Sequence, residues 1–183
     1  MKGLMILANG FEDVEALATL DVLRRSKLNV TLVSVNNTLE VTTQSNIVVK
    51  AEKLFNELDI NEFDFLIIPG GRAVFQVLDK MNEIDNLINH FANNNKLVCA
   101  ICAAPHLVGK LGHLKNKLFT CFPTCEEQII GGTYLKDQGV VTSGNFIAGK
   151  AMYYSFDFAL AIIKHLQGEE QAKKVLASIK GEL

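Results

Sequence analysis

The chain has 183 residues, of which 49% are hydrophobic, and its formal net charge at pH 7 is -2. This length supports one well-packed domain over residues 1–183 and is too short for two comfortable ones. The 18 Lys and Arg residues are scattered along the chain, which argues against nucleic acid as a partner.

The first eight residues could pass for a short secretory signal, but their apolar run is brief, and the acidic Glu12 and Asp13 follow it without a cleavage-type segment. Later apolar runs fall short of the roughly 18 residues that a membrane span needs. We therefore expect a cytoplasmic protein without a membrane partner. A reducing compartment also fits the four cysteines, since a chain with an adequate core does not need a disulfide framework.

Apolar, β-branched runs alternate with segments of helical period along the chain. The expected strands are residues 4–8, 30–35, 65–68 and 97–101. The first helix is expected over residues 14–23, because its apolar residues recur at helical spacing. Near-continuous apolar strands separated by helices indicate an α/β fold with a parallel sheet covered by helices on both faces.

Three further segments have recognisable patterns. Residues 39–43 and 46–49 are two short β-like pieces that predict a hairpin projecting from the sheet. Residues 148–166 predict one long helix and residues 169–179 a second, with Gly168 between them as a C-cap.

The expected strand at residues 65–68 runs into Pro69, Gly70 and Gly71. Two adjacent glycines can let backbone amides face a ligand. The alternative is a simple connector that needs positive φ angles, and the sequence leaves both interpretations open.

Residues 96–109 are the most informative segment, because a strand ends at Cys102 and the small residues Ala103 and Ala104 follow it. Small neighbours permit a sharp strand-to-helix turn, which is the geometry of a nucleophile elbow. This turn would place Cys102 at the carboxyl end of a central strand, where open α/β sheets bind ligands. The helix N-terminus behind it favours the thiolate, so we expect the pKa of Cys102 to lie below its usual value of about 8.5.

Other interpretations of the cysteines remain. Cys102 could be a small buried hydrophobe, as free cysteines often are. Cys99 and Cys102 spell the C-x-x-C of a thioredoxin-like pair, but three residues along a strand reverse the face to which a side chain points. With Cys121 and Cys125 the spacing comes close to that of a zinc site, although an apolar strand is an unusual setting for zinc ligands, and we expect no metal.

Three motifs, at residues 10–16, 69–71 and 100–105, resemble marks of the ThiJ/PfpI superfamily, also called the DJ-one superfamily. Their order and spacing match over most of the chain, and residues 155–162 resemble the last long helix of the DJ-one branch. The resemblance implies a flavodoxin-like three-layer sandwich with a mostly parallel sheet. It also implies a homodimer, with the first helix a candidate interface element.

The resemblance further implies an oxidation-sensitive cysteine at the elbow, which is Cys102, hydrogen-bonded to a glutamate of the first helix, which is Glu15. Without this resemblance, Glu15 would be interpreted as an ordinary first-turn acid that the helix dipole favours. The pair is physically sensible only if Glu15 is protonated. Burial and like charge would raise its pKa, whereas the helix start opposes that shift, and the sequence leaves the outcome open.

The chain departs from the superfamily pattern at two places. Phe122 stands where many relatives carry histidine beside the cysteine, so His106, four residues after Cys102, becomes the candidate substitute base. The more common role of such a histidine is in packing or at the surface. Residues 142–150 replace a shorter Gly-Pro-Gly-Thr type of turn, which leaves pocket shape and substrate open.

The resemblance implies a cofactor-independent enzyme of glyoxalase or deglycase type that converts small 2-oxoaldehydes such as methylglyoxal to hydroxy acids. Cys102 would attack the aldehyde carbon and Glu15 would move the protons, while amides around Gly70, Gly71 and Ala103 would hold the oxyanion. The alternative is an oxidative-stress sensor or redox-regulated chaperone in which an oxidant converts Cys102 to sulfinic acid without turnover. A Cys-His peptidase of the PfpI type is disfavoured, because Ala103 and not histidine follows the cysteine.

Overall fold

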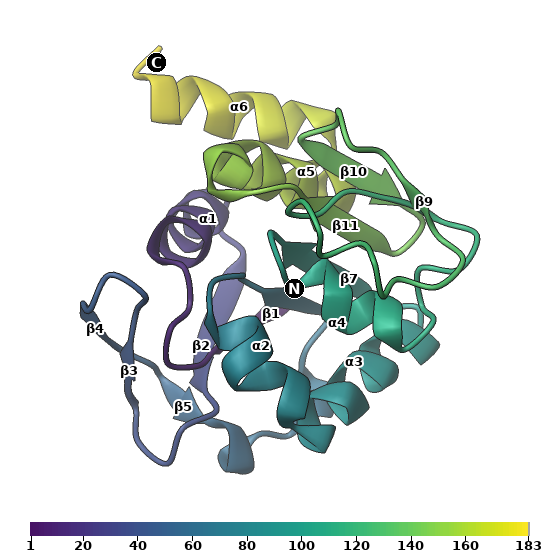
Figure 1. Cartoon of the computed structure of the whole chain (residues 1–183). Coiled ribbons are helices and arrows are strands. Elements are labelled where there is room, and N and C mark those ends of the chain that lie inside the picture. The colour runs from purple at the N-terminus through teal and green to yellow at the C-terminus, as the bar shows by residue number, and fades with distance from the viewer. Residues whose placement is uncertain (183) are drawn as a thin grey trace.

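The structure, a computed structural model that describes residues 1–182, is built around a seven-stranded sheet (Figure 1). The strand order is β10-β11-β7-β6-β1-β2-β5, and within this sheet β10 alone runs antiparallel to its neighbour. The strands are β1 (Lys2–Leu7), β2 (Asn29–Ser34), β5 (Lys53–Leu54), β6 (Phe65–Ile68), β7 (Leu97–Ile101), β10 (Val140–Ser143) and β11 (Phe146–Gly149). The expected α/β fold with a mostly parallel sheet is confirmed.

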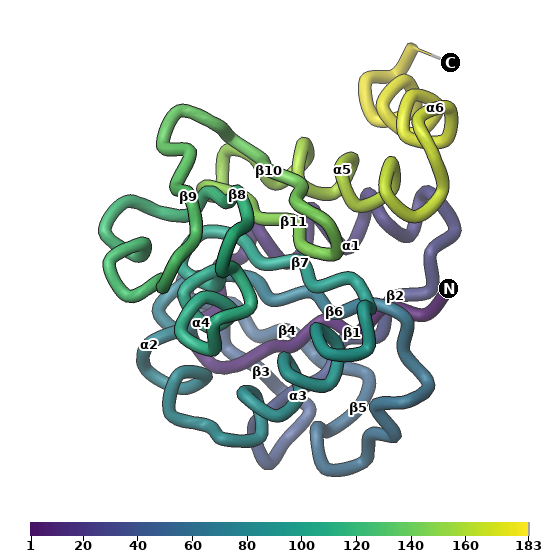
Figure 2. Tube along the Cα trace, turned by 90° about the vertical axis from the view of Figure 1, so that its right-hand side faces the viewer, coloured from purple at the N-terminus to yellow at the C-terminus, as the bar shows by residue number. Residues whose placement is uncertain are grey.

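Helices cover both faces of the sheet. Helices α1 (Asp13–Arg25) and α5 (Ser155–Gln167) lie on one face, and α3 (Asn82–Asn93) and α4 (Pro105–Lys110) lie on the other (Figure 1). The last helix, α6 (Glu169–Lys180), packs on the outer side of α5 (Figure 2). Every residue of β6 and β7 is buried, as expected for central strands covered on both sides. This arrangement confirms the flavodoxin-like three-layer sandwich.

Three central strands end at one edge of the sheet and position the site. Strand β6 lies between β1 and β7 in parallel register, with Phe65 opposite both Gly3 and Leu97. After β1 the chain continues to α1, after β6 to the short α2 (Ala73–Gln76), and after β7 to α4. Because the carboxyl ends of parallel strands meet at one edge, the three loops lie side by side there.

The hairpin predicted over residues 39–49 is present. Its strands, β3 (Glu40–Thr42) and β4 (Val48–Lys50), form a separate antiparallel sheet. The hairpin is tied to the segment before α1, since the Gly10 N–H donates to the Thr42 carbonyl at 2.7 Å and Phe11 bridges to Thr43. One side of the hairpin therefore borders the loop that follows β1.

The prediction of one helix over residues 148–166 is wrong at its start. Helix α5 begins at Ser155, and Ala148 lies in β11, where it pairs with Ala100 of β7. The apolar run of β11 is buried along its whole length, and Gly144, with a φ of 62°, forms the tight turn that joins it to β10. The second helix is confirmed, since α6 covers Glu169–Lys180 and follows Gly168, whose φ is 91°.

The remaining elements are short. Strands β8 (Leu118–Phe119) and β9 (Thr133–Tyr134) pair in parallel on either side of an irregular segment, residues 120–132. Single turns of 3-10 helix cover Phe55–Glu57, Ile60–Glu62, Leu78–Lys80 and Met152–Tyr154. Within residues 1–182, the helices are too short or too polar to cross a membrane.

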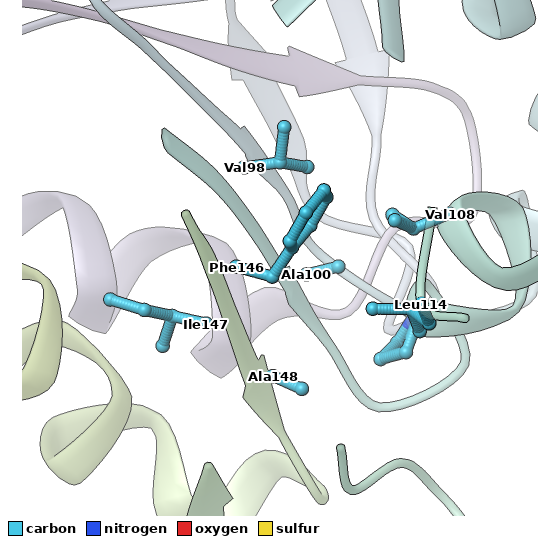
Figure 3. A pocket seen from close by; sticks show the side chains of 8 residues that line it. Val98, Ala100, Val108, Leu114, Phe146, Ile147 and Ala148 are labelled. Atoms are coloured by element: carbon cyan, nitrogen blue, oxygen red, sulfur yellow. The ribbon is translucent and has the colours of Figure 1, made fainter. Parts of the chain in front are cut away.

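A small apolar cavity of about 10 Å³ lies between β7, β11 and α4 (Figure 3). Apolar side chains line it, among them those of Val98, Val108 and Phe146. A cavity of this size has room for one water molecule at most, and these walls offer such a water no polar partner. The cavity is therefore a packing defect and not a ligand site.

Candidate functional site

Cys102 follows β7 directly and has a φ of 64°, in the left-handed region that residues other than glycine rarely adopt. Two hydrogen bonds hold this conformation. The Cys102 N–H donates to the Gly149 carbonyl at 2.9 Å, and the Phe122 N–H donates to the Cys102 carbonyl at 2.8 Å. Backbone strain of this kind costs about 1–3 kcal/mol and is concentrated at functional positions. The sharp turn predicted at Cys102 is therefore present.

Cys102 is the accessible cysteine of the four. It is half-buried, whereas the other three are buried, and all four are free thiols. Cys99 lies inside β7 with no exposed surface, which excludes the thioredoxin-like pair. Across residues 1–182, no three Cys, His, Asp or Glu side chains are grouped as a metal site.

Glu15 lies in the first turn of α1, and the structure brings it to Cys102. Glu12 caps this helix, because its Oε2 atom accepts a hydrogen bond from the Glu15 N–H at 2.7 Å. The Glu15 side chain is 1% exposed, and its Oε2 atom accepts a hydrogen bond from the Gly70 N–H at 2.8 Å. Its carboxyl group also lies beside the Cys102 thiol and interacts with it, while its Oε1 atom is buried without a geometric hydrogen-bond partner.

Gly70 and Gly71 have different roles beside this pair. A Cβ atom on Gly70 would lie 2.6 Å from the Cys102 Cβ and 2.7 Å from the Glu15 Oε2, so only glycine lets the two side chains approach. The N–H of Gly70 is occupied by Glu15, which does not fit its predicted use for an oxyanion. The N–H groups of Gly71 and Ala103 point instead at the Cys102 sulfur.

We expect the Gly71→Ala variant to lower the free energy of unfolding by about 3 kcal/mol, because strain at positive φ adds to a backbone clash. Gly71 has a φ of 90°, and an added Cβ would lie 2.5 Å from the Glu12 nitrogen. Gly112→Ala is the matched control, since its φ is 82° but nothing lies within 4 Å. Urea denaturation of both variants measures the difference, and equal losses would contradict the clash.

Burial controls the ionisation of the pair. It raises the pKa of the Glu15 carboxyl to about 7, against the opposing hydrogen bonds from Cys102 and Gly70. Burial also raises the pKa of the Cys102 thiol, the charge of Glu15 adds to the increase, and the amides of Gly71 and Ala103 oppose it. The expected low pKa of Cys102 is therefore wrong, because the short α4 does not outweigh burial and a neighbouring carboxylate.

The two groups titrate as a coupled pair, which releases its first proton near pH 7 and holds the second to much higher pH. Above neutrality, one proton is thus shared between Glu15 and Cys102. When Glu15 holds it, the sulfur is a thiolate that faces a neutral acid. This tautomer is the nucleophilic form of the site.

A cavity of about 390 Å³ opens above the Cys102 sulfur. Two half-exposed aromatic rings, Phe75 and Phe122, form part of its wall, and Arg72 lies beside them with its Nη2 donating to the Gln44 carbonyl at 3.0 Å. The full lining is Glu12, Gln44, Gly71, Arg72, Phe75, Cys102, Ala103, Phe122, Thr124 and Cys125.

The structure turns His106 away from Cys102. It lies in α4, is 2% exposed, and its Nε2 atom is 3.3 Å from Asp79 Oδ1, while its ring packs against Phe75. It does not line the cavity. The geometry therefore gives no support to the prediction that His106 is a base for Cys102.

Two polar lining residues escaped the sequence prediction. Glu12 precedes Glu15 by three residues, and this capping spacing could have identified Glu12 from the sequence. Burial raises the pKa of the Glu12 carboxyl. Arg72 directly follows Pro69–Gly71, so its position after the turn was visible. Nothing local in the sequence shows that Cys125 reaches the same cavity.

Comparison with known proteins places these features in context. Residues 1–165 match the DJ-1/PfpI family. Protein dj-1beta of Drosophila melanogaster is 29% identical over 175 residues, which cover 95% of this chain and 94% of that protein. Protein DJ-1 homolog B of Arabidopsis thaliana is 33% identical over 92% of this chain, which spans only 38% of the plant protein's length.

Solved structures agree with the sequence matches. The crystal structure of Drosophila melanogaster DJ-1beta superposes with a TM-score of 0.91 at 28% identity, over 97% of this chain and 96% of that one. Oxidised Toxoplasma gondii DJ-1 superposes with a TM-score of 0.89 at 29% identity, over 97% of each chain.

Proposed function

The chain belongs to the DJ-1/PfpI family, and we propose that it is a cofactor-independent enzyme that converts small 2-oxoaldehydes to hydroxy acids through Cys102. The observation that carries the proposal is the buried Glu15 carboxyl beside the half-buried Cys102 thiol, under an open cavity. This arrangement places a nucleophile, the Cys102 sulfur, next to a proton carrier, the Glu15 carboxyl group with its pKa of about 7. Both groups can then act on the aldehyde carbon of one substrate molecule.

The first step uses the thiolate tautomer. The Cys102 sulfur attacks the aldehyde carbon of methylglyoxal, the carbonyl electrons move to oxygen, and the Glu15 proton passes to that oxygen to give a hemithioacetal. The N–H groups of Gly71 and Ala103 lie next to the sulfur and would stabilise the developing oxyanion. Glu15 is left as a carboxylate, which is the form that the next step needs.

The second step moves a hydrogen between neighbouring carbons. The Glu15 carboxylate removes the proton from the former aldehyde carbon, and the electron pair moves to the ketone oxygen to give an enediolate. Glu15 then returns this proton to the former ketone carbon, and the hydroxyl proton of the former aldehyde carbon passes to the other oxygen, which gives a lactoyl thioester. Water then hydrolyses the thioester, which releases lactate and restores the Cys102 thiol. The sum is methylglyoxal plus water giving lactic acid, so no redox cofactor is consumed.

The test is to incubate the purified protein with methylglyoxal alone and to follow substrate loss and lactate formation. We expect lactate to accumulate over many turnovers, with the rate rising through about pH 7 as the pair loses its first proton. Substrate loss that stops after one equivalent would show binding without turnover and would reject the enzymatic proposal.

A second candidate function is oxidative-stress sensing. The half-buried Cys102 is accessible to small oxidants, and a similar structure, Toxoplasma gondii DJ-1, is described as oxidised. In this proposal two molecules of peroxide each add one oxygen to the sulfur and leave as water or alcohol, and a protonated Glu15 donates a hydrogen bond to the sulfinate. A protein that forms sulfinate at Cys102 but produces no lactate would favour this function.

We further propose that the protein is a homodimer. Two apolar surfaces lie near each other, because the hairpin is hydrogen-bonded to the segment that leads into α1. Both surfaces carry apolar side chains that are at least one-third exposed, namely Val14 and Leu17 on α1 and Ile47 and Val48 on the hairpin. A second copy would cover them.

We expect light scattering to give about twice the chain mass of 20.2 kDa. Leu17→Asp should shift the protein to the monomer, because it places a charge in the proposed interface. Leu118→Asp is the control, since Leu118 is also exposed but lies on β8. A monomeric wild type, or equal masses for both variants, would reject this interface.

A further inference from the structure

The irregular segment between β8 and β9 brings a second thiol to the Cys102 cavity. Cys102 and Cys125 both line the same space of about 390 Å³. The Phe122 N–H donates to the Cys102 carbonyl at 2.8 Å, and the Cys125 N–H donates to the Phe122 carbonyl at 3.1 Å. The backbone of Phe122 is therefore hydrogen-bonded to both cysteines, which are distant from each other in the sequence.

Neither of the remaining cysteines faces this space. Cys99 and Cys121 have no exposed surface and do not line the cavity. The Cys121 sulfur points towards Glu126, with 4.0 Å between the Sγ atom and Oε2. Cys125 is thus the thiol placed to meet a modified Cys102.

We propose that Cys125 is the resolving thiol of Cys102, which condenses with the oxidised sulfur to form a Cys102–Cys125 disulfide. The inference rests on the proposed reactivity of Cys102 and does not require carbonyl turnover. Cys125 would thereby trap the sulfenic acid of Cys102 as a reversible disulfide before further oxidation gives the irreversible sulfinic acid.

The reaction needs a hydroperoxide as oxidant and proceeds in two steps. The Cys102 thiolate attacks the distal peroxide oxygen, the O–O bond breaks, the alcohol or water leaves with a proton, and sulfenic acid forms on Cys102. The Cys125 sulfur then attacks the Cys102 sulfur, the S–O bond breaks, and the hydroxyl group leaves as water with the Cys125 proton. An external dithiol restores both thiols and is itself oxidised to a disulfide.

The position of Cys125 in the chain favours this closure. A disulfide requires Cα atoms about 4.4–6.8 Å apart, so any adjustment that closure needs has to come from one of the two cysteines. Cys102 is fixed by its hydrogen bonds to Gly149 and Phe122, whereas Cys125 belongs to a segment of turns without helix or strand. Such a connecting segment moves at lower cost than the sheet edge that carries Cys102.

Peptide mapping separates this disulfide from the others. Cleavage after lysine places Cys99 and Cys102 on residues 97–110, and Cys121 and Cys125 on residues 118–136. The reduced protein is treated with an excess of hydrogen peroxide, because sulfinic acid takes two equivalents, one for each oxygen. Its free thiols are then blocked by alkylation, and it is digested without reductant. Fragmentation of the linked peptides then identifies the two sulfurs.

We expect the wild type to give a cross-link between the two peptides that joins Cys102 to Cys125 and disappears with dithiothreitol. Cys125→Ala should lose the cross-link and accumulate sulfinic acid at Cys102, while Cys121→Ala, the matched control, should keep the cross-link. Cys102→Ser should give neither product.

Two results would overturn the inference: sulfinic acid at Cys102 in the wild type without a cross-link, or a disulfide confined to residues 118–136. The wild-type map decides this without any variant having to fold. A cross-link without lactate formation would reject the carbonyl chemistry alone, and lactate formation without a cross-link would reject the resolving thiol alone.

Discussion

The Cys102→Ser variant is expected to convert methylglyoxal to lactate at least about 1000-fold more slowly than the wild type, since removing a catalytic nucleophile has effects of this size or larger. A serine hydroxyl is a weaker acid and a poorer nucleophile than the thiol that it replaces, so Glu15 cannot generate a comparable nucleophile from it. The variant keeps the volume and most of the hydrogen bonding of the site.

The measurement is the initial rate of lactate formation, with Cys121→Ser as the control. Cys121 is buried outside the cavity, so its substitution tests for general effects of losing a thiol. A Cys102→Ser protein with wild-type activity would move the chemistry away from this sulfur. Thermal denaturation of both variants verifies that they are folded.

The Glu15→Gln variant is expected to gain stability while it loses activity. In the unfolded chain Glu15 ionises near its usual pKa of 4.5, whereas in the folded protein it keeps its proton to about pH 7. The free energy of unfolding therefore falls as pH rises from 4.5 to about 7. Above about pH 7 the wild-type protein carries the buried charge of the Glu15 carboxylate. Above neutral pH this charge costs about 3 kcal/mol, which the uncharged glutamine removes.

Urea denaturation at pH 5 and pH 8 tests this prediction. We expect Glu15→Gln to exceed the wild type in stability at pH 8 and the gap to narrow at pH 5, while Glu40→Gln, an exposed control, tracks the wild type. The rate of lactate formation should fall by about 100-fold, because the proton carrier is gone. A variant that is less stable than wild type at pH 8 would contradict the buried charge.

Periodicity was sufficient to predict the architecture, and its failure at β11 has a local cause. Residues 65–68 and 97–101 are buried on both sides, so their unbroken apolar runs are typical of central strands. Residues 146–149 are equally apolar, but only Lys150 separates them from the further apolar residues that lead to α5. Only the pairing of β11 with β7, a contact between distant residues, distinguishes strand from helix there.

The site was predictable where its determinants are local. The small residues after Cys102 indicate the turn, and the motif resemblance points to Glu15. The pKa of Cys102 was wrongly predicted, because the balance between a helix terminus and burial depends on what packs over the sulfur. The roles suggested for Gly70 and His106 lacked support for the same reason, since Glu15 and Asp79 engage these groups from distant segments.

The unusual backbone of Cys102 has a consequence for how the protein is made. Its left-handed conformation depends on Gly149 and Phe122, and its acidic neighbour arrives from the opposite end of the chain. Contacts between residues so far apart in sequence carry a large loop-closure entropy and require the intervening chain to be present. During synthesis, Cys102 is consequently an ordinary thiol. Its left-handed conformation and its raised pKa require that β11 has first paired with β7.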